Sequence, residues 1–125
     1  MITRRSAFGA TLAFVGVGAV AQAASAKKLS KKELKILIET AKTAADHQRL
    51  ANYYSAMAVG FEEEAKEHSA EAEAYAKNPT IQEMKNPGGA NTASHCRFFA
   101  AKYTEMAETA RTMSTMHSEM AKNAK

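Results

Sequence analysis

The sequence predicts an all-α protein built around an antiparallel helical hairpin, and three observations support this. Two long proline-free runs, Lys31 to Lys77 and Thr92 to Lys125, are rich in strong helix formers. Between them, the segment Asn78 to Asn91 contains two Asn-Pro pairs and a Gly pair, which is typical of a connecting loop. No stretch alternates with the two-residue period of a β-strand. We therefore expect two long helices and a loop, with a short helix before them.

The first residues have the layout of a cleaved signal peptide. Arg4 and Arg5 precede an uncharged apolar run of about 14 residues, Ala7–Val20, and Ala-x-Ala cleavage sites follow at Ala21–Ala23 and Ala24–Ala26. A membrane-spanning helix needs about 20 apolar residues, so we expect no permanent membrane anchor. The arginine pair is compatible with Sec or twin-arginine export. The predicted location is the periplasm or the outside of a bacterial cell.

Cleavage after Ala26, the end of a signal peptide over residues 1–26, would leave residues 27–125 as a single helical domain. Without Arg4 and Arg5, fifteen basic residues face thirteen acidic ones, which is a net charge of +2. Most of the excess is a lysine cluster between Lys27 and Lys35, and the later charges are interspersed as on solvated helix faces. This charge pattern does not favour a nucleic-acid partner.

An internal repeat relates the two long helical runs. When Thr43 is placed over Thr92, an offset of 49, nine of thirty positions are identical. Five of these identities are not alanine: Thr43/Thr92, Tyr54/Tyr103, Met57/Met106, His68/His117 and Ser69/Ser118. We interpret the repeat as a duplicated helix.

Both copies carry small residues every seven positions. This set, which we call the alanine seam, is Ala44, Ala51, Ala58, Ala65 and Ala72, then Ala93, Ala100, Ala107, Ser114 and Ala121. A second stripe lies three positions later: His47, Tyr54, Phe61, His68 and Tyr75, then Cys96, Tyr103, Ala110, His117 and Ala124. Strict seven-residue spacing predicts left-handed coiled-coil packing of the two helices.

A third line of apolar residues widens the apolar face beyond what one hairpin buries. Its members are Leu50, Met57, Phe99, Met106, Met113 and Met120. Either a third helix of the same chain or a second chain must cover this line. Two hairpins paired as a dimer would form a four-helix bundle.

The segment before the hairpin predicts a short helix over about residues 30–42. Ser30-x-x-Glu33 is a capping-box pattern, and an apolar stripe of Leu34, Leu37, Ile38 and Ala41 follows. That stripe is out of phase with the alanine seam, so we expect a break near Thr40 to Thr43. The hairpin helices are then expected at about 43–77 and 92–123, with a loop at 78–91 and Thr92 as the cap of the last helix. One continuous long helix is the alternative, because no Gly or Pro enforces the break.

The second stripe carries two polar positions in each copy, His47 and His68 in the first, Cys96 and His117 in the second. The two members on one helix are 21 residues apart, roughly 31 Å along its axis. An antiparallel hairpin brings His68 level with Cys96, and His47 level with His117. His95, one place before Cys96, is expected to point outward.

These paired positions allow three interpretations. A histidine at the end of a seam and a buried cysteine are often purely structural. Imidazole and thiolate also suit zinc or copper, and thioethers favour Cu(I). Met113, His117 and Met120 share one helix face and are the best local support for a metal site. The candidate metal ligands are His47, His68, Cys96, His117, Met113 and Met120.

The third interpretation is thiol chemistry. One cysteine in an oxidising compartment cannot form an internal disulfide, so it must be buried, pair with another chain, bind metal or react. Near the start of a helix capped by Thr92, the helix dipole and an imidazolium would lower the pKa of Cys96. With a lowered pKa, Cys96 would act as an oxidant sensor or form a disulfide with another chain. The sequence shows no oxyanion donors and no orienting acid for a catalytic cysteine, so we expect no catalytic residues and no enzyme.

The acidic residues are interpreted as a solvated helix face. Glu62, Glu63, Glu64, Glu67, Glu71 and Glu73 alternate with Lys66 and alanines. A di-iron bundle would need Glu-x-x-His on two helices, and this spacing does not occur. The sequence thus predicts an exported, non-catalytic helical protein that associates with itself or with a protein partner. The alternative is a soft-metal protein that binds copper or zinc.

Overall fold

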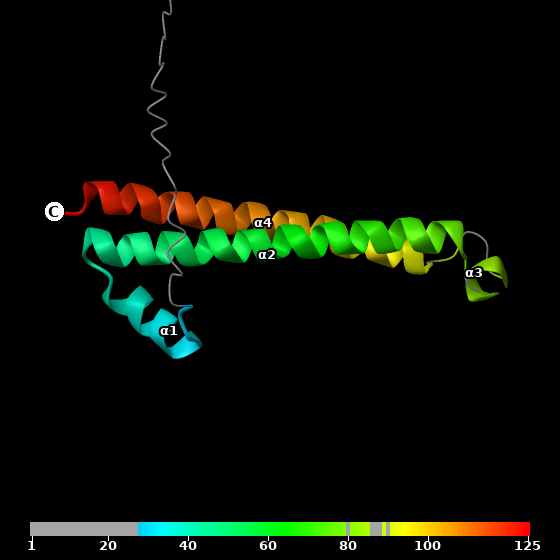
Figure 1. The fold of residues 1–125 in the computed structure, drawn as a ribbon, viewed down its shortest axis with the longest axis horizontal. Helices are drawn as coiled ribbons and strands as arrows, with labels where there is room; N and C mark the ends of the chain where they lie inside the picture. Colours follow the sequence, from blue (N-terminus) through cyan, green and yellow to red (C-terminus); the bar gives the residue numbers. More distant parts are fainter. Residues whose placement is uncertain (1–27, 80, 86–88, 90) are drawn as a thin grey trace, which may run out of the picture.

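The computed structural model describes residues 28–79, 81–85, 89 and 91–125. This part of the chain forms α1 (Lys31–Thr40), α2 (Ala44–Lys77), α3 (Ile81–Lys85) and α4 (Thr92–Asn123), and contains no strand. Figure 1 shows α2 and α4 side by side and antiparallel, with α1 near the first turns of α2 and α3 at the opposite end. The predicted all-α hairpin with a short preceding helix is therefore confirmed.

Capping boxes start both α1 and α2. The Ser30 hydroxyl accepts the backbone N–H of Glu33 at 3.2 Å, and the Glu33 carboxylate accepts the N–H of Ser30 at 2.9 Å. Thr43 and Asp46 make the same reciprocal pair, with both distances at 3.1 Å. Because Thr43 is an N-cap, the chain breaks between α1 and α2 as expected, and the alternative of one continuous helix is wrong.

Six of the ten members of the alanine seam lie in the buried core of the hairpin, whereas Ala44 is exposed. Ser114 of α4 donates a hydrogen bond to the backbone oxygen of Ala51 in α2 at 2.8 Å, which fixes the register of the two helices. Seven of the eleven buried hydrophobic residues in the described part are alanines. These eleven are Leu37, Leu50, Ala51, Tyr54, Ala58, Ala72, Ala93, Cys96, Ala100, Ala107 and Ala110. Small side chains let the helices approach closely, but they bury little apolar area each.

The third apolar line is only partly covered. Leu50 is buried and Met57 is half-buried, and α1 contributes one buried residue, Leu37. On α4 the rest of the line stays open: Phe99, Met106, Met113 and Met120 are between 36 and 48% exposed. Helix α1 of the same chain therefore does not cover the α4 part of this line.

The connection between the long helices differs from the predicted loop in two ways. Helix α3 occupies five residues between the two prolines, and Glu83 within it accepts the backbone N–H of Thr92 at 2.6 Å. The N-cap of α4 is Asn91, whose side chain accepts the N–H of Ser94 at 2.7 Å. The expectation that Thr92 is the cap is wrong by one residue, because the amide oxygen of the preceding asparagine takes that role.

The predicted signal peptide, residues 1–26, lies outside the described residues. Within the described helices, none combines the length and the apolar character that crossing a bilayer requires.

Candidate metal centre

The α2–α4 seam carries a polar cluster near each of its ends, in the pairing that the sequence predicts. His68 lies with Cys96 toward α3, and His47 lies with His117 toward the C-terminal end of α4. We call His68, Glu71 and Cys96 the thiol cluster, and His47 with His117 the histidine pair. His95 is exposed, as expected from its position beside the seam.

The thiol cluster brings three potential metal ligands to one point. Nδ1 of His68 and Oε2 of Glu71 are 3.0 Å apart, and Sγ of Cys96 lies 3.7 Å from the same carboxylate oxygen. All three ligand atoms lie within 4.8 Å of one another. His68 and Glu71 are neighbours on one face of α2, three positions apart, whereas Cys96 comes from the second turn of α4. The cluster therefore exists only in the folded hairpin.

Aromatic rings hold the imidazole of His68 in place. Its ring stacks on Tyr103 of α4, with centroids 5.5 Å apart and planes 8° apart. The ring centroid of Phe99 lies 5.3 Å from that of His68. Cys96 is buried at 7% exposure, while the side chain of Glu71 is 53% exposed. The cluster thus has two aromatic rings and a buried thiol on one side and a carboxylate open to solvent on the other.

The pKa of the Cys96 thiol is raised above its ordinary value. Burial is the main cause, and the charge of the Glu71 carboxylate and its hydrogen bond to the thiol add to it. The predicted lowering of this pKa by the helix dipole is wrong, because burial and a nearby carboxylate both favour the neutral thiol. A protonated, buried thiol is a poor nucleophile, so the structure gives no support to a reactive cysteine.

Two of the three ligand separations in the thiol cluster are close to those of a tetrahedral zinc site. Zinc binds sulfur at about 2.3 Å and nitrogen or oxygen at about 2.0–2.2 Å, so neighbouring ligand atoms lie about 3.3–3.6 Å apart. The observed separations of 3.0 and 3.7 Å differ from this range by a few tenths of an ångström. The third separation, between an imidazole nitrogen of His68 and Sγ of Cys96, is no more than 4.8 Å. Side-chain movements of about an ångström would therefore bring all three groups onto one ion, with a fourth position left open.

The histidine pair has two ring nitrogens in direct contact. Nδ1 of His47 and Nδ1 of His117 are 3.3 Å apart, and the rings stack with centroids 5.5 Å apart. The ring of His117 also stacks on the buried Tyr54, with centroids 5.7 Å apart and planes 5° apart. Burial, and then the charge of His47, lower the pKa of His117. The neutral form of His117 is therefore favoured.

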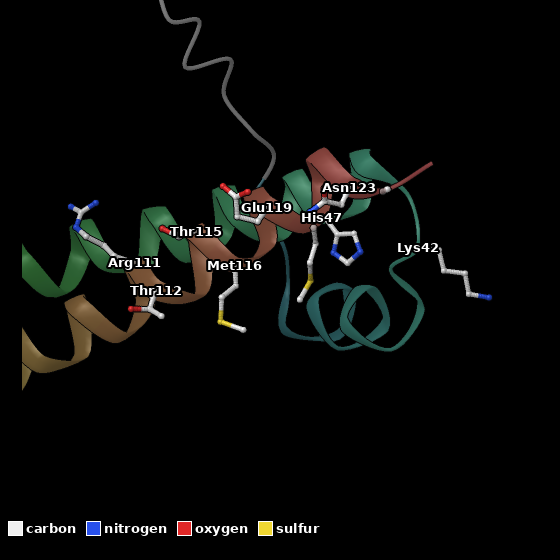
Figure 2. A pocket seen from close by; sticks show the side chains of 10 residues that line it. Lys42, His47, Arg111, Thr112, Thr115, Met116, Glu119 and Asn123 are labelled. Carbon is white, nitrogen blue, oxygen red and sulfur yellow. The ribbon is translucent and has the colours of Figure 1, made fainter.

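The two predicted methionine ligands lie in different places. Met120 lines an open pocket together with His47, Met116 and Glu119. Figure 2 shows the His47 ring and the Met116 side chain on the same side of the two helices, with Lys42 pointing away at the edge. Met113 instead lines a separate groove with Met57, Phe61 and Met106. Met113 therefore joins neither polar cluster, and Met120 shares a pocket with His47 of the histidine pair.

Sequence reasoning missed Glu71, which it assigned to the solvated acidic face. The spacing His68-x-x-Glu71 was a signal for it, because residues three apart on a helix are neighbours. A di-iron motif has the reverse order, Glu-x-x-His, and so does not include this pair. Another member of the acidic set, Glu62, behaves as a surface residue and forms an ion pair with Arg111 at 2.6 Å.

Comparison with known protein families, with curated proteins and with solved structures finds no match to this chain.

Proposed function

We propose that the protein binds a zinc-class or copper-class transition-metal ion at the thiol cluster, as a non-catalytic metal-binding protein of the bacterial periplasm or exterior. The observation that carries this proposal is the convergence of an imidazole, a carboxylate and a thiol from two helices. Three protein ligands leave one coordination position for water or for a donor from another protein. An open position suits an ion that is taken up and passed on.

The ligand types support zinc or copper above other metals. Magnesium and calcium bind through oxygen ligands, and the thiol cluster has one carboxylate among three groups. Thiolate and imidazole together suit Zn(II), Cu(I) and Cu(II), and a carboxylate as the third ligand favours Zn(II) over Cu(I). His68 and Cys96 are held by ring stacking and burial, so binding has to reposition mainly the exposed Glu71.

The test is a Zn(II) titration of the reduced protein under anaerobic conditions, in competition with a chromophoric zinc indicator. We expect one equivalent to bind, and we expect Cys96→Ser, His68→Gln and Glu71→Gln each to lower the affinity. Because even outer-sphere changes cost about 10–100-fold, each loss should be at least about tenfold. The matched control is His95→Gln, which removes the exposed imidazole next to Cys96 and should bind as the wild type does.

Circular dichroism of each variant checks that the helices are intact. No uptake at micromolar zinc, or equal affinities for the wild type and the three ligand variants, would contradict the proposal. The cluster would then serve only to pack the seam.

Self-association is a second candidate function, favoured by the exposed apolar line on α4. Phe99, Met106, Met113 and Met120 recur every seven residues, and the hairpin core is mostly alanine. In the repeat, Met113 and Met120 correspond to Glu64 and Glu71, so the apolar line is longer on α4 than on α2. Pairing of α4 with a second copy along this line would bury it and would form a four-helix bundle.

Sedimentation equilibrium tests this second candidate. We expect a concentration-dependent dimer that Met106→Glu dissociates, since this change places a charge in the middle of the line. The control is Ala101→Glu, at an exposed position of α4 away from the line, which should leave the dimer intact. A wild-type protein that stays monomeric up to millimolar concentration would exclude the dimer.

A further inference from the structure

We propose a second metal centre at the opposite end of the seam, in which the imidazoles of His47 and His117 and the thioether of Met120 hold Cu(I). This centre does not rest on the thiol cluster and goes beyond the function proposed above. Both centres contain an imidazole, but the second has another imidazole and a thioether in place of the thiol and the carboxylate.

The internal repeat makes the two ends of the seam equivalent. The offset of 49 relates His47 to Cys96, Tyr54 to Tyr103, His68 to His117 and Glu71 to Met120. The structure keeps the equivalence, because His117 stacks on Tyr54 at 5.7 Å and 5° while His68 stacks on Tyr103 at 5.5 Å and 8°. Each end thus presents one ring-stacked imidazole. The groups around that imidazole are a thiol and a carboxylate at one end, and an imidazole and a thioether at the other.

The histidine pair already has the spacing of two ligands on one ion. With metal–nitrogen bonds of about 2.0 Å, a nitrogen–nitrogen separation of 3.3 Å corresponds to an angle of about 110° at the metal. That angle fits a trigonal or tetrahedral ion. The space between the two Nδ1 atoms holds at most one proton, which bridges them in a hydrogen bond. A metal ion bound by both nitrogens would replace that proton.

Met120 is placed to supply the third ligand. It follows His117 by three positions, as Glu71 follows His68, and it lines the same pocket as His47. Its side chain is 42% exposed, so it is free to turn toward the imidazoles. A thioether is neutral and soft, which selects Cu(I) over Zn(II).

The charges around the pocket also favour a monovalent ion. Lys42, Arg111 and Glu119 line it, and Arg111 is paired with Glu62. This pocket therefore lacks the surplus of acidic groups that would compensate a divalent ion held by three neutral ligands. About three heptads separate the two centres, roughly 31 Å along the hairpin, so each can be tested without the other.

The test uses the Cys96→Ser protein, which lacks the thiol, and Cu(I) under anaerobic conditions in competition with bicinchoninate. We expect one Cu(I) to bind per chain. Adding Met120→Leu or His117→Gln should lower the affinity by at least about tenfold, since these changes remove a direct ligand. The matched control is Met113→Leu, the same conservative change one heptad earlier on α4, which should leave the affinity unchanged. X-ray absorption should show nitrogen and sulfur neighbours around the bound copper.

Failure to bind Cu(I), or an equal loss of affinity with Met113→Leu and Met120→Leu, would overturn the second centre. If the serine variant loses helix content, Cys96→Ala replaces it, because the second stripe already carries a buried alanine at Ala110. A failure here leaves the zinc titration of the thiol cluster unaffected, so the two proposals are separable.

Discussion

Ser114 of α4 donates a hydrogen bond to the backbone oxygen of Ala51 in α2, across the alanine seam. Because the helices are antiparallel, a step of seven residues forward on α2 and back on α4 places Ala58 opposite Ala107. Both of these alanines are buried. The seam therefore leaves no room for larger side chains.

Replacing Ala58 by leucine should destabilise the hairpin. Ala58 is fully buried, and added methylene groups in a packed core cost about 1–3 kcal/mol. Urea denaturation followed by circular dichroism measures the loss in free energy of unfolding. Ala101→Leu, on the exposed side of α4, should change that free energy by less than about 0.5 kcal/mol. Equal effects of both changes would mean that the seam is not the packed interface.

Thr43→Ala should lower stability because it removes the N-cap of α2. The hydroxyl of Thr43 accepts the N–H of Asp46, and losing such a cap costs about 1 kcal/mol. The chain supplies its own control in Thr92, the repeat counterpart of Thr43, which follows the cap Asn91. Thermal unfolding of Thr43→Ala and Thr92→Ala should show a clearly lower melting temperature for the first variant only.

Stability should fall as the solution is acidified through the titration range of His117. Its pKa is lower in the folded protein than the ordinary 6.5, so the unfolded chain binds more protons between these two values. The contribution of neutral His117 is complete above pH 6.5 and is lost as pH falls through the lower folded pKa. Urea unfolding from pH 8 to pH 5 should show this loss. It should be smaller in His117→Gln and unchanged in His95→Gln.

Zinc binding at the thiol cluster should weaken as pH falls. The Cys96 thiol has a raised pKa and is protonated at neutral pH, so zinc must displace its proton. Release of one proton makes the affinity fall by about tenfold for each pH unit below the thiol pKa. Indicator competition at pH 6.5, 7.5 and 8.5 measures the slope. The Cys96→Ser protein should show a shallower slope, and a pH-independent wild-type affinity would show that the thiol is not a ligand.

Much of the hairpin follows from the spacing of residues in the sequence. The seven-residue period of the alanines determines which faces meet, and the turn-forming residues after Lys77 require the second helix to run back. These two facts place His68 level with Cys96 and His47 level with His117, and the structure confirms both pairings.

The missed features depend on side-chain conformation and on local competition. Glu71 lies on the exposed edge of α2, where the sequence does not reveal whether a carboxylate faces water or turns toward the partner helix. The sequence predicts the cap of α4 one residue too late, because Asn91 and Thr92 are both good capping residues. The sequence predicts a lowered pKa for Cys96, whereas burial and the carboxylate of Glu71 raise it. Neither effect is visible from the position of Cys96 near the start of a helix.

The near-twofold equivalence of the two seam ends has a consequence for how such a chain can specialise. If each helix were a separate molecule that paired with an identical antiparallel copy, every substitution would appear at both ends at once. Joining the copies through the segment that contains α3 removes this constraint. Cys96 and His47 occupy equivalent positions with different chemistry, and so do Glu71 and Met120. The covalent link allows one scaffold, used twice, to present two different surfaces to solutes.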